Sequence, residues 1–467
     1  MPRVTRINNR TLASTDSRAY DASLRLETLL SRYARTGRPI AANFRRLVGW
    51  IPYGERFTHL IHPYPAKLLH HIPAFFLAND ILSKPGDIVL DPFCGSGTVL
   101  LESILVARRG IGFDANPLAR LISRTKVAEL DLPALRRSSE ALFRRLRDEP
   151  RSPPPNVVNL EYWFYPHVTR DLCRLREAVE ATRSEPVREF FQVAFSATVR
   201  KVSLADPRLS VPVRLKRDQY PEHHWLRAKS NSHLTSLRRQ RVVETFKTIL
   251  QSNIGRLSRL NDVRPVGIRA AVIGSDAKML VDDVGELGRP GDLLASASVP
   301  LVITSPPYLG AQKYIRASSL SLGWLGLTEN QSLRDLERLS IGREHLSRQE
   351  ANREWFTSEQ SALQSIDASN RLRASIASTY LHEMHDAVRE ISRVLKPGGY
   401  LVLVSANNRV CGRLFATERM LREMCESFGL KVRLRLVDHI RSRGLMTTRN
   451  STASVITREW VTVFEKA

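Results

Sequence analysis

The sequence has few of the features that mark disulfide-bonded, zinc-binding or membrane-spanning proteins. Only four of its 467 residues are cysteines, and none belongs to a Cys-x-x-Cys pair: Cys94, Cys173, Cys411 and Cys425. This spacing predicts reduced thiols rather than a disulfide or zinc framework. The histidines are scattered too, so we expect no metal. No run of about 18 apolar residues occurs and residues 1–6 lack a signal-peptide core, which predicts a cytoplasmic protein without a membrane partner.

Acidic residues are also scarce. The chain has 47 Asp and Glu against 71 Lys and Arg, which gives a formal net charge of +24 and a pI of about 10.5. A protein this basic favours a polyanionic partner, and nucleic acid is the first to consider. The hydrophobic share of 42% is ordinary for a folded protein, and the length leaves room for two or three domains.

The most informative stretch is Ser305-Pro306-Pro307-Tyr308, which follows the apolar run 299–304. Consecutive prolines fix their own φ angles and push the residue before each of them out of the α region. The sequence therefore predicts a stiff turn at the end of a buried strand, with outward carbonyls and a Tyr308 ring held as a platform. Such a turn suits an exocyclic amino group, whose base would stack on the ring. Taken alone, it is more typical of a rigid turn without further function.

A second motif lies far upstream. The apolar strand Ile88–Asp91 runs into a loop with Gly95 and Gly97, and a second strand ends at Asp114, where nucleotide-binding folds place a ribose-binding acid. Leu100 stands where the dinucleotide fingerprint has its third glycine, which argues against NAD. Asp91 would repel a pyrophosphate, but it would attract the α-ammonium group of S-adenosyl-L-methionine. The loop therefore favours a sulfonium cofactor.

With both motifs present, the chain resembles the amino-methylating DNA methyltransferases. In that family an Asp-Pro-Phe-x-Gly-Ser-Gly-Thr loop binds S-adenosyl-L-methionine and a (Ser/Asn/Asp)-Pro-Pro-(Tyr/Phe) turn holds a flipped base. The resemblance implies an α/β fold, a Rossmann-like methyltransferase sheet with a mainly helical basic insertion. It implies catalysis by Ser305, Pro306, Pro307 and Tyr308. It implies cofactor binding by Tyr64, Pro65, Ala66, Asp91, Pro92, Phe93, Gly95, Gly97, Thr98, Asp114, Asn116 and Asp276.

The resemblance also suggests individual roles. Residues 62–67 look like the segment that closes over the methionine end of the cofactor. Asp114 matches the acid that holds the ribose hydroxyls, and Asp276 sits where the family has a polar residue near the adenine ring. Hydrogen bonds from the target amino group to the Ser305 side chain and the Pro306 carbonyl would free the nitrogen lone pair for in-line attack.

The target base is the open question in this interpretation. Ser at the first position of the turn is commoner in cytosine-N4 enzymes, so we predict cytosine N4, with adenine N6 as the alternative. C5-cytosine chemistry needs a cysteine nucleophile in a Pro-Cys turn, and no Pro-Cys pair occurs. An RNA guanine-N2 methyltransferase and a catalytically dead DNA-binding subunit are further alternatives. The predicted partner is double-stranded DNA, and a restriction endonuclease or other defence subunits would fit the same setting.

A long basic stretch separates Asp114 from the strand before Asp276, so we predict an inserted domain there. It carries Arg pairs and interleaved aromatic residues, which suit DNA contact. The predicted organisation is an N-terminal arm (1–50), a first catalytic segment (51–129), an inserted DNA-recognition domain (130–262), a second catalytic segment (263–327), a flap or surface insertion (328–378) and a third catalytic segment (379–467).

Hydrophobic periodicity places several elements. Helices are expected over 20–33, 168–182, 234–250 and 380–395. Strands over 430–440 and 454–464 are expected to form an antiparallel hairpin at the edge of the sheet. The basic link 441–444 between them is expected to meet DNA. Gln312, Lys313, Tyr314 and Arg316, just after the turn, are expected near the site.

Overall fold

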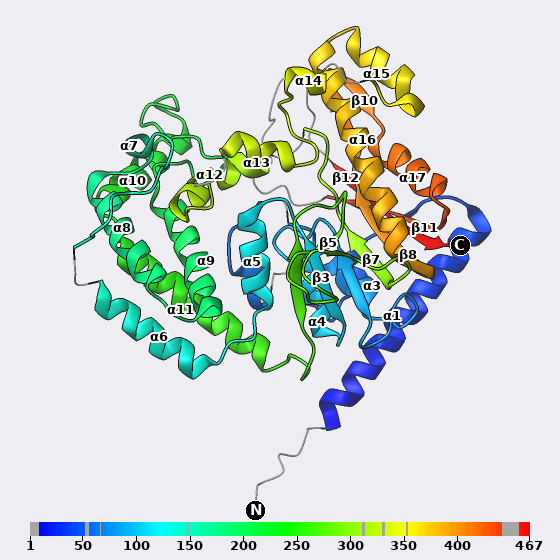
Figure 1. Ribbon diagram of the computed structural model, residues 1–467, viewed down its shortest axis with the longest axis horizontal. Coiled ribbons are helices and arrows are strands. Elements are labelled where there is room, and N and C mark those ends of the chain that lie inside the picture. Colours follow the sequence, from blue (N-terminus) through cyan, green and yellow to red (C-terminus); the bar gives the residue numbers. More distant parts are fainter. Residues whose placement is uncertain are drawn as a thin grey trace, which may run out of the picture.

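The computed structural model describes residues 9–51, 56–65, 67–146, 149–310, 313–328, 332–351, 354–440 and 457–467, with the backbone alone for 9–19 and 348 (Figure 1). Ala66, Gln312 and the predicted link 441–444 lie outside these residues. In Figure 1 the sheet lies in the middle, helices α6 to α11 gather on its left, and α14 to α16 lie at the upper right.

One mixed sheet organises the molecule. Its strand order is β1-β11-β12-β8-β7-β2-β3-β4. The strands are β1 (Ile40–Ala42), β2 (Ile88–Asp91), β3 (Arg109–Phe113), β4 (Ala270–Gly274), β7 (Val299–Thr304), β8 (Leu395–Ser405), β11 (Leu430–His439) and β12 (Arg458–Lys466). Short pairs form outside it, β5 (Val281–Asp282) with β6 (Asp292–Leu293) and β9 (Asn408–Val410) with β10 (Arg413–Phe415).

The parallel half of the sheet carries both sequence motifs. β2 pairs in parallel with β3 on one side and with β7 on the other, and β4 pairs with β3. Most apolar residues of β2 and β7 are buried, as strands covered on both faces require. The carboxyl ends of these strands meet at one edge, where α/β sheets bind ligands. The predicted α/β fold is confirmed.

The expected edge hairpin is antiparallel, but its predicted place is wrong. β11 and β12 pair as expected, and β12 also pairs with β8. The edge is occupied by β1, whose Ile40 and Ala42 stand in register with Leu436 and Asp438 of β11. A short strand from the N-terminal region of the chain thus covers the backbone groups that β11 would otherwise expose.

The remaining elements are mostly helices. The helices that precede the basic insertion are α1 (Asn9–Thr36), α2 (Phe44–Leu47), η1 (Phe57–Leu60), α3 (His71–Leu77), α4 (Thr98–Leu105) and α5 (Pro117–Val127). The expected helix over 20–33 is therefore confirmed and is longer than predicted. The later ones are α12 (Tyr314–Trp324), α13 (Leu333–Leu339), α14 (Arg348–Ala351), η2 (Thr357–Glu359), α15 (Gln360–Asp367), α16 (Arg371–Val394) and α17 (Thr417–Ser427). None of the described helices has the length and hydropathy needed to cross a membrane.

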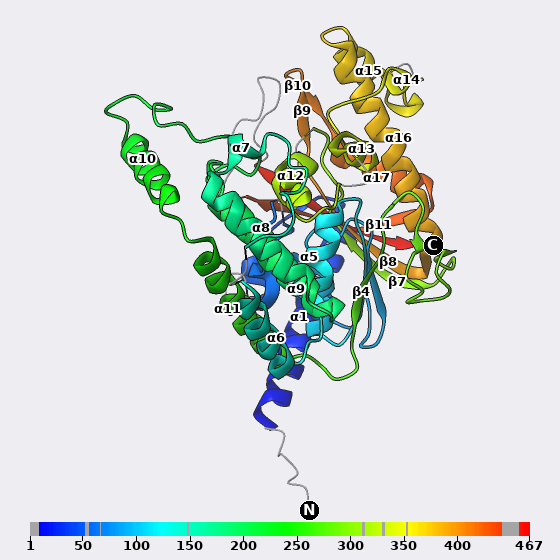
Figure 2. The ribbon, with the colours of Figure 1, turned by 60° about the vertical axis from the view of Figure 1, so that its left-hand side comes forward.

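The basic insertion is mainly helical, as predicted. Its helices are α6 (Leu132–Arg145), α7 (Leu160–Trp163), α8 (Pro166–Glu180), α9 (Glu185–Val202), α10 (Trp225–Arg238) and α11 (Val242–Asn261). The single helix expected over 234–250 is wrong, because the chain breaks between α10 and α11. Leu234 and Leu237 of α10 pack on Leu204 and Leu215, whereas α11 packs in the main insertion core. The two helices therefore pack against different parts of the insertion, and Figure 2 shows α10 projecting away from α11.

The insertion shares a core with the cofactor-motif segment. Ile61 and Tyr64 belong to the same buried cluster as the apolar faces of α5, α8, α9 and α11. Asn253 of α11 donates from Nδ2 to the Ile61 carbonyl at 3.0 Å. His62 Nε2 lies 2.9 Å from Ser196 Oγ of α9. The segment 61–64 is therefore held by the insertion on one side and by the sheet-covering helix α5 on the other.

The region 328–378 contributes to the core as well as to the surface. Leu363 and Ile366 of α15 are buried in the cluster that contains Leu381 and Met384 of α16. The helix expected over 380–395 is confirmed as the second half of α16, which begins at Arg371.

Candidate active site

The glycine loop is shaped by backbone hydrogen bonds at the end of β2. Phe93 N–H donates to Asp91 Oδ1 at 3.1 Å, and Cys94 N–H donates to the Phe113 carbonyl of β3 at 2.8 Å. Gly97 has φ 73° and precedes the first residue of α4, Thr98. A Cβ on Gly97 would lie 2.9 Å from Ser123 Oγ, so both the conformation and the space require glycine. The loop thus opens the N-terminus of α4 to a ligand.

Asp114 completes the loop from the next strand. Its Oδ2 accepts a hydrogen bond of 2.9 Å from Gly95 N–H, and its Oδ1 accepts one of 2.8 Å from Asn116 N–H. Burial raises the pKa of the Asp114 carboxyl, although these two backbone donors and Arg120 act in the opposite direction. Each oxygen keeps acceptor capacity for a hydroxyl group, which is what a ribose diol needs.

Tyr64 is tied to this acid through Asn116. The Asn116 Nδ2 donates to Tyr64 Oη and to Ser318 Oγ, both at 3.1 Å, while its Oδ1 accepts from Leu118 N–H as the cap of α5. The Asn116 side chain is thus occupied by protein groups. Its geometry holds the Tyr64 ring beside Asp114, whose charge is one cause of the raised pKa of the Tyr64 hydroxyl, after burial.

Asp91 is buried, and its charge is only partly compensated by the described residues. Its Oδ1 accepts a hydrogen bond of 2.6 Å from the hydroxyl of Thr304, the last residue of β7. Burial raises the pKa of Asp91 to about 7, against the lowering effects of the Thr304 hydroxyl and the Phe93 N–H, and with a further rise from Asp114. A cation that approaches such a carboxylate stabilises its ionised form. Sequence reasoning missed Thr304, whose only signal is its place between the apolar strand and Ser305.

The Ser-Pro-Pro-Tyr turn leaves β7 directly after Thr304. The Tyr308 hydroxyl donates to Glu459 Oε1 of β12 at 3.2 Å. The Leu309 carbonyl accepts a hydrogen bond from Asn408 Nδ2, and a Cβ on Gly342 would lie 3.4 Å from the Tyr308 carbonyl oxygen. The turn is therefore supported from three separate regions of the chain. Glu459 was also missed, because nothing near it in the sequence marks it.

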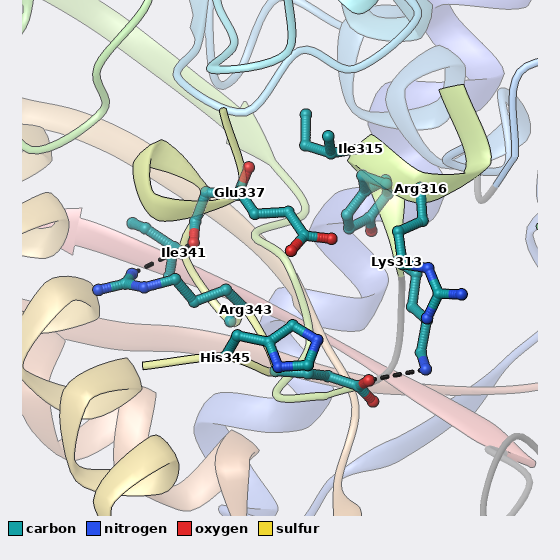
Figure 3. A pocket seen from close by; sticks show the side chains of 11 residues that line it. Lys313, Ile315, Arg316, Glu337, Ile341, Arg343 and His345 are labelled. Atoms are coloured by element: carbon teal, nitrogen blue, oxygen red, sulfur yellow. Dashed lines mark hydrogen bonds and ion pairs between the residues drawn. The ribbon is translucent and has the colours of Figure 1, made fainter. Parts of the chain in front are cut away.

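The residues that follow the turn line a small pocket (Figure 3). Lys313 Nζ pairs with Glu344 Oε2 at 2.8 Å, and Figure 3 shows Arg316 beside them. Tyr314 lines the same pocket. Lys313, Tyr314 and Arg316 therefore gather next to the turn, as expected.

Asp276 lies at the same edge of the sheet. It follows β4, whose Gly274 is in register with Phe113 and accepts a backbone bond from Asp114 N–H at 3.4 Å. Asp276 Oδ1 accepts from Lys278 N–H at 2.9 Å. Its side chain is about half exposed, which leaves it open to a ligand.

Pro65, Pro92 and Phe93 complete the set of predicted cofactor residues. Pro92 is buried, whereas Pro65 and Phe93 are partly buried. Phe93 packs against the core cluster beneath β2 and β7. Within the described residues, no group of His, Cys, Asp and Glu side chains is arranged to hold a metal ion.

Comparison with known proteins gives a consistent result. The family model described as DNA methylase, of the N6 and N4 type, matches residues 62–123. The type II methyltransferase M.MvaI of Kocuria varians is 23% identical over 396 residues, which are 80% of this chain and 82% of that protein. The type II methyltransferase M.BsoBI of Geobacillus stearothermophilus is 24% identical over 423 residues, 82% of this chain and 78% of that protein.

Among solved structures, a SAM-dependent methyltransferase of Methanosarcina mazei overlaps 82% of this chain and 94% of its own, with 10% identity and a TM-score of 0.29. The family match spans the segment before β2, the glycine loop and Asp114.

Proposed function

We propose that this chain is an amino-methylating DNA methyltransferase. It would methylate N4 of a cytosine flipped out of double-stranded DNA, with S-adenosyl-L-methionine as the methyl donor. The observation that carries this proposal is the hydrogen bond between Thr304 and Asp91, which joins the Ser-Pro-Pro-Tyr turn to the glycine loop. Ligands bound at these two neighbouring strand ends would lie side by side, as in-line transfer requires.

The residues at the glycine loop fit the cofactor. When bound, S-adenosyl-L-methionine supplies an electrophilic methyl group on a sulfonium sulfur. Asp91 has a buried carboxyl with a raised pKa, so a cationic ammonium group is the partner that stabilises its ionised form. The Asp114 oxygens, each with one backbone donor, would accept from the ribose hydroxyls. Tyr64 and Pro65 would cover the methionine end, and Asp276 would face the adenine end.

The turn would receive the target base. Pro306 contributes a backbone carbonyl and no N–H, and Ser305 contributes a hydroxyl that can accept from an amino hydrogen. Together they would hold both amino hydrogens and favour a tetrahedral nitrogen, which frees its lone pair. The Tyr308 ring would stack on the base. Pro307 would keep the turn rigid.

The insertion would hold the DNA. Trp225 at the start of α10 is 72% exposed, and it continues a stacked series with His224 and Tyr220, whose ring planes are 19° and 20° apart. Exposed stacked rings of this kind suit contact with bases. Arg238 and Arg239 at the other end of α10 are exposed and available for phosphates. Arg200, by contrast, donates to backbone carbonyls within the insertion, so its role is structural.

In both views α10 lies on the same side of the molecule as α12, which follows the catalytic turn, whereas α6 lies at the opposite end of the insertion (Figures 1 and 2). The α10 end is therefore the region of the insertion that we assign to DNA near the site.

Base-resolved modification sequencing of DNA from a host that expresses the chain tests the proposal. We expect N4-methylcytosine at one fixed position of one sequence motif. N6-methyladenine at such a position would replace the cytosine assignment with the alternative that shares the same turn, and unmodified DNA would refute both. Two further points stay predictions. The type II relatives suggest that the chain acts alongside a restriction endonuclease, and we expect a cytoplasmic location.

A further inference from the structure

Glu459 is an acid that reaches the catalytic turn from a distant strand. It lies near the start of β12, in register with Asp438 of β11. Its Oε1 accepts the hydrogen bond of Tyr308 Oη at 3.2 Å, across 151 residues of sequence. The Ser305 side chain lies close enough to the Tyr308 hydroxyl to lower its pKa, against the larger rise caused by burial. Glu459 and Tyr308 are thus joined by a hydrogen bond, and Ser305 lies beside the Tyr308 hydroxyl.

The support beneath Glu459 is rigid. The next residue, Trp460, is in register with Ser405 of β8 and with Val437 of β11, so β12 is paired on both sides directly after Glu459. The Arg435 guanidinium lies 5.1 Å from the centre of the Trp460 ring. A carboxyl on such a strand cannot follow the turn if the turn moves. It therefore sets a fixed point for the Tyr308 hydroxyl.

We propose that Glu459 is a positioning residue for methyl transfer, which fixes the Tyr308 ring and the direction of hydrogen bonding through Ser305. This inference rests on the proposed function of the turn. An ionised carboxylate can only accept hydrogen bonds, so the Tyr308 O–H points to Glu459. The Tyr308 oxygen is then free to accept from the Ser305 O–H. The Ser305 lone pairs are left to accept from the target amino group.

The hydrogen bond to Glu459 also keeps the ring usable. Tyr308 donates through its hydroxyl, which lies in the plane of the ring and at its far end, so both ring faces stay available for stacking. Without the hydrogen bond to Glu459, the Tyr308 ring would lose its fixed orientation. The base stacked on it would then no longer be held in one position.

Protonation of Glu459 would reverse the direction of the hydrogen bonds that run from Ser305 through Tyr308 to Glu459. A neutral carboxylic acid can donate to Tyr308, which would then donate towards Ser305 and turn the Ser305 hydroxyl away from its acceptor role. Burial raises the pKa of the Glu459 carboxyl, the Tyr308 bond lowers it, and Asp438 raises it further. Tyr314 of α12 is the other ionisable group that acts on Tyr308. The transfer rate should therefore fall as the pH decreases through the raised pKa of Glu459.

The test is single-turnover transfer of labelled methyl groups to a duplex that carries the sequence identified by modification sequencing, at saturating cofactor. Saturation removes the contribution of cofactor binding. Four variants are compared with the parent: Glu459→Ala, Glu459→Gln, Tyr308→Phe and the double variant Tyr308→Phe/Glu459→Ala. Glu465→Gln is the matched control, because Glu465 lies on the same strand and pairs with Arg433 at 2.5 Å. Cofactor affinity and thermal unfolding are measured for each.

We expect Glu459→Ala to lower the transfer rate by about 10- to 100-fold, as for the loss of one hydrogen bond to a charged group, with cofactor affinity unchanged. Glu459→Gln, which keeps an acceptor oxygen, should recover some of the rate and lose the acidic limb of the pH profile. Glu459→Ala should have no further effect in the Tyr308→Phe background, because both changes remove the same bond. Glu465→Gln should behave as the parent.

Two outcomes would overturn the inference: a parental rate for a folded Glu459→Ala variant, or full additivity of the Glu459→Ala and Tyr308→Phe effects. Failure of the proposed function looks different. In that case Tyr308→Ala itself would transfer methyl groups at the parental rate, and the turn would not be the catalytic site.

Discussion

The hydroxyl of Thr304 donates a hydrogen bond of 2.6 Å to Oδ1 of Asp91. The two residues are the last of β7 and β2, and they are 213 positions apart in the sequence. Each stands directly before one of the two motifs, because Asp91 opens the glycine loop and Thr304 precedes Ser305. The bond therefore fixes the distance between the place assigned to the methyl donor and the place assigned to the base. It also selects the Asp91 oxygen that stays open to a ligand.

Cofactor affinity should increase with pH around neutrality. The pKa of Asp91 is raised to about 7, so at lower pH the carboxyl is protonated and cannot pair with an ammonium group. Binding of the cation should lower this pKa and release protons. Isothermal titration in two buffers of different ionisation enthalpy measures the release directly. Proton-neutral binding at pH 7 would contradict the assignment of Asp91, and Asp91→Asn should bind weakly at every pH.

The same group predicts an opposite trend for the stability of the free protein. A raised folded-state pKa means that Asp91 favours folding below its unfolded pKa, and that this contribution is lost as the pH rises to about 7. Asp91→Asn keeps an acceptor for Thr304 and removes the buried charge. We expect a higher melting temperature than the parent at pH 8 and little difference at pH 4, with unfolding followed by circular dichroism.

Thr304→Val should weaken cofactor binding without changing the fold. Valine has nearly the shape of threonine, so the main change is the loss of the donor to Asp91, worth about 1.5–3 kcal/mol for a charged acceptor. The pKa of Asp91 should rise further, which moves the pH dependence of affinity upward. Thr462→Val is the control, since Thr462 is a buried threonine of β12 in the same sheet. Equal affinities for the two variants would contradict the proposed link.

Gly97→Ala should destabilise the loop more than an ordinary glycine replacement. Both Gly97 and Gly398 have positive φ, 73° and 72°, but a Cβ on Gly97 would lie 2.9 Å from Ser123 Oγ, whereas a Cβ on Gly398 would meet nothing within 4 Å. The difference between the two alanine variants therefore isolates the steric term. Denaturant unfolding should show the larger loss for Gly97→Ala, which should also lose cofactor binding. Similar losses in both would show that strain in φ alone accounts for the effect.

Replacement of Arg238 and Arg239 by glutamine should weaken DNA binding and flatten its salt dependence. Each lost phosphate contact lowers the slope of log affinity against log salt by about one. Arg136 and Arg137 on α6 are the matched control, an exposed pair at the other end of the insertion. Fluorescence anisotropy over a salt series measures both. A larger change from the α6 pair would move the proposed DNA-contacting end of the insertion.

The contiguous motifs were predictable from sequence because their letters carry backbone requirements. The positive φ of Gly97, the acid at the end of β2 and the acid just after β3 each leave a local trace, and the DNA methylase family model matches the segment that carries them. The long-range partners leave none. Glu459 and Thr304 act on residues more than a hundred positions away, and no local pattern records that pairing.

The errors have the same origin. The break between α10 and α11 follows from two different packing partners, although the sequence is helical on both sides. The placement of β11 and β12 inside the sheet depends on the short strand β1, whose three residues are too few for a periodic signal.

The position of β12 also has a consequence for how the protein folds during its synthesis. β12 lies between β8 and β11, although both precede it in the chain. During synthesis β8 and β11 emerge before β12, so the pairing of each with β12 can form only after β12 is made. Glu459 travels on that strand, so a nascent chain has its glycine loop and its Ser-Pro-Pro-Tyr turn well before it has the anchor of Tyr308. If Glu459 acts as proposed, a partly made chain would be unable to mark DNA until the sheet closes.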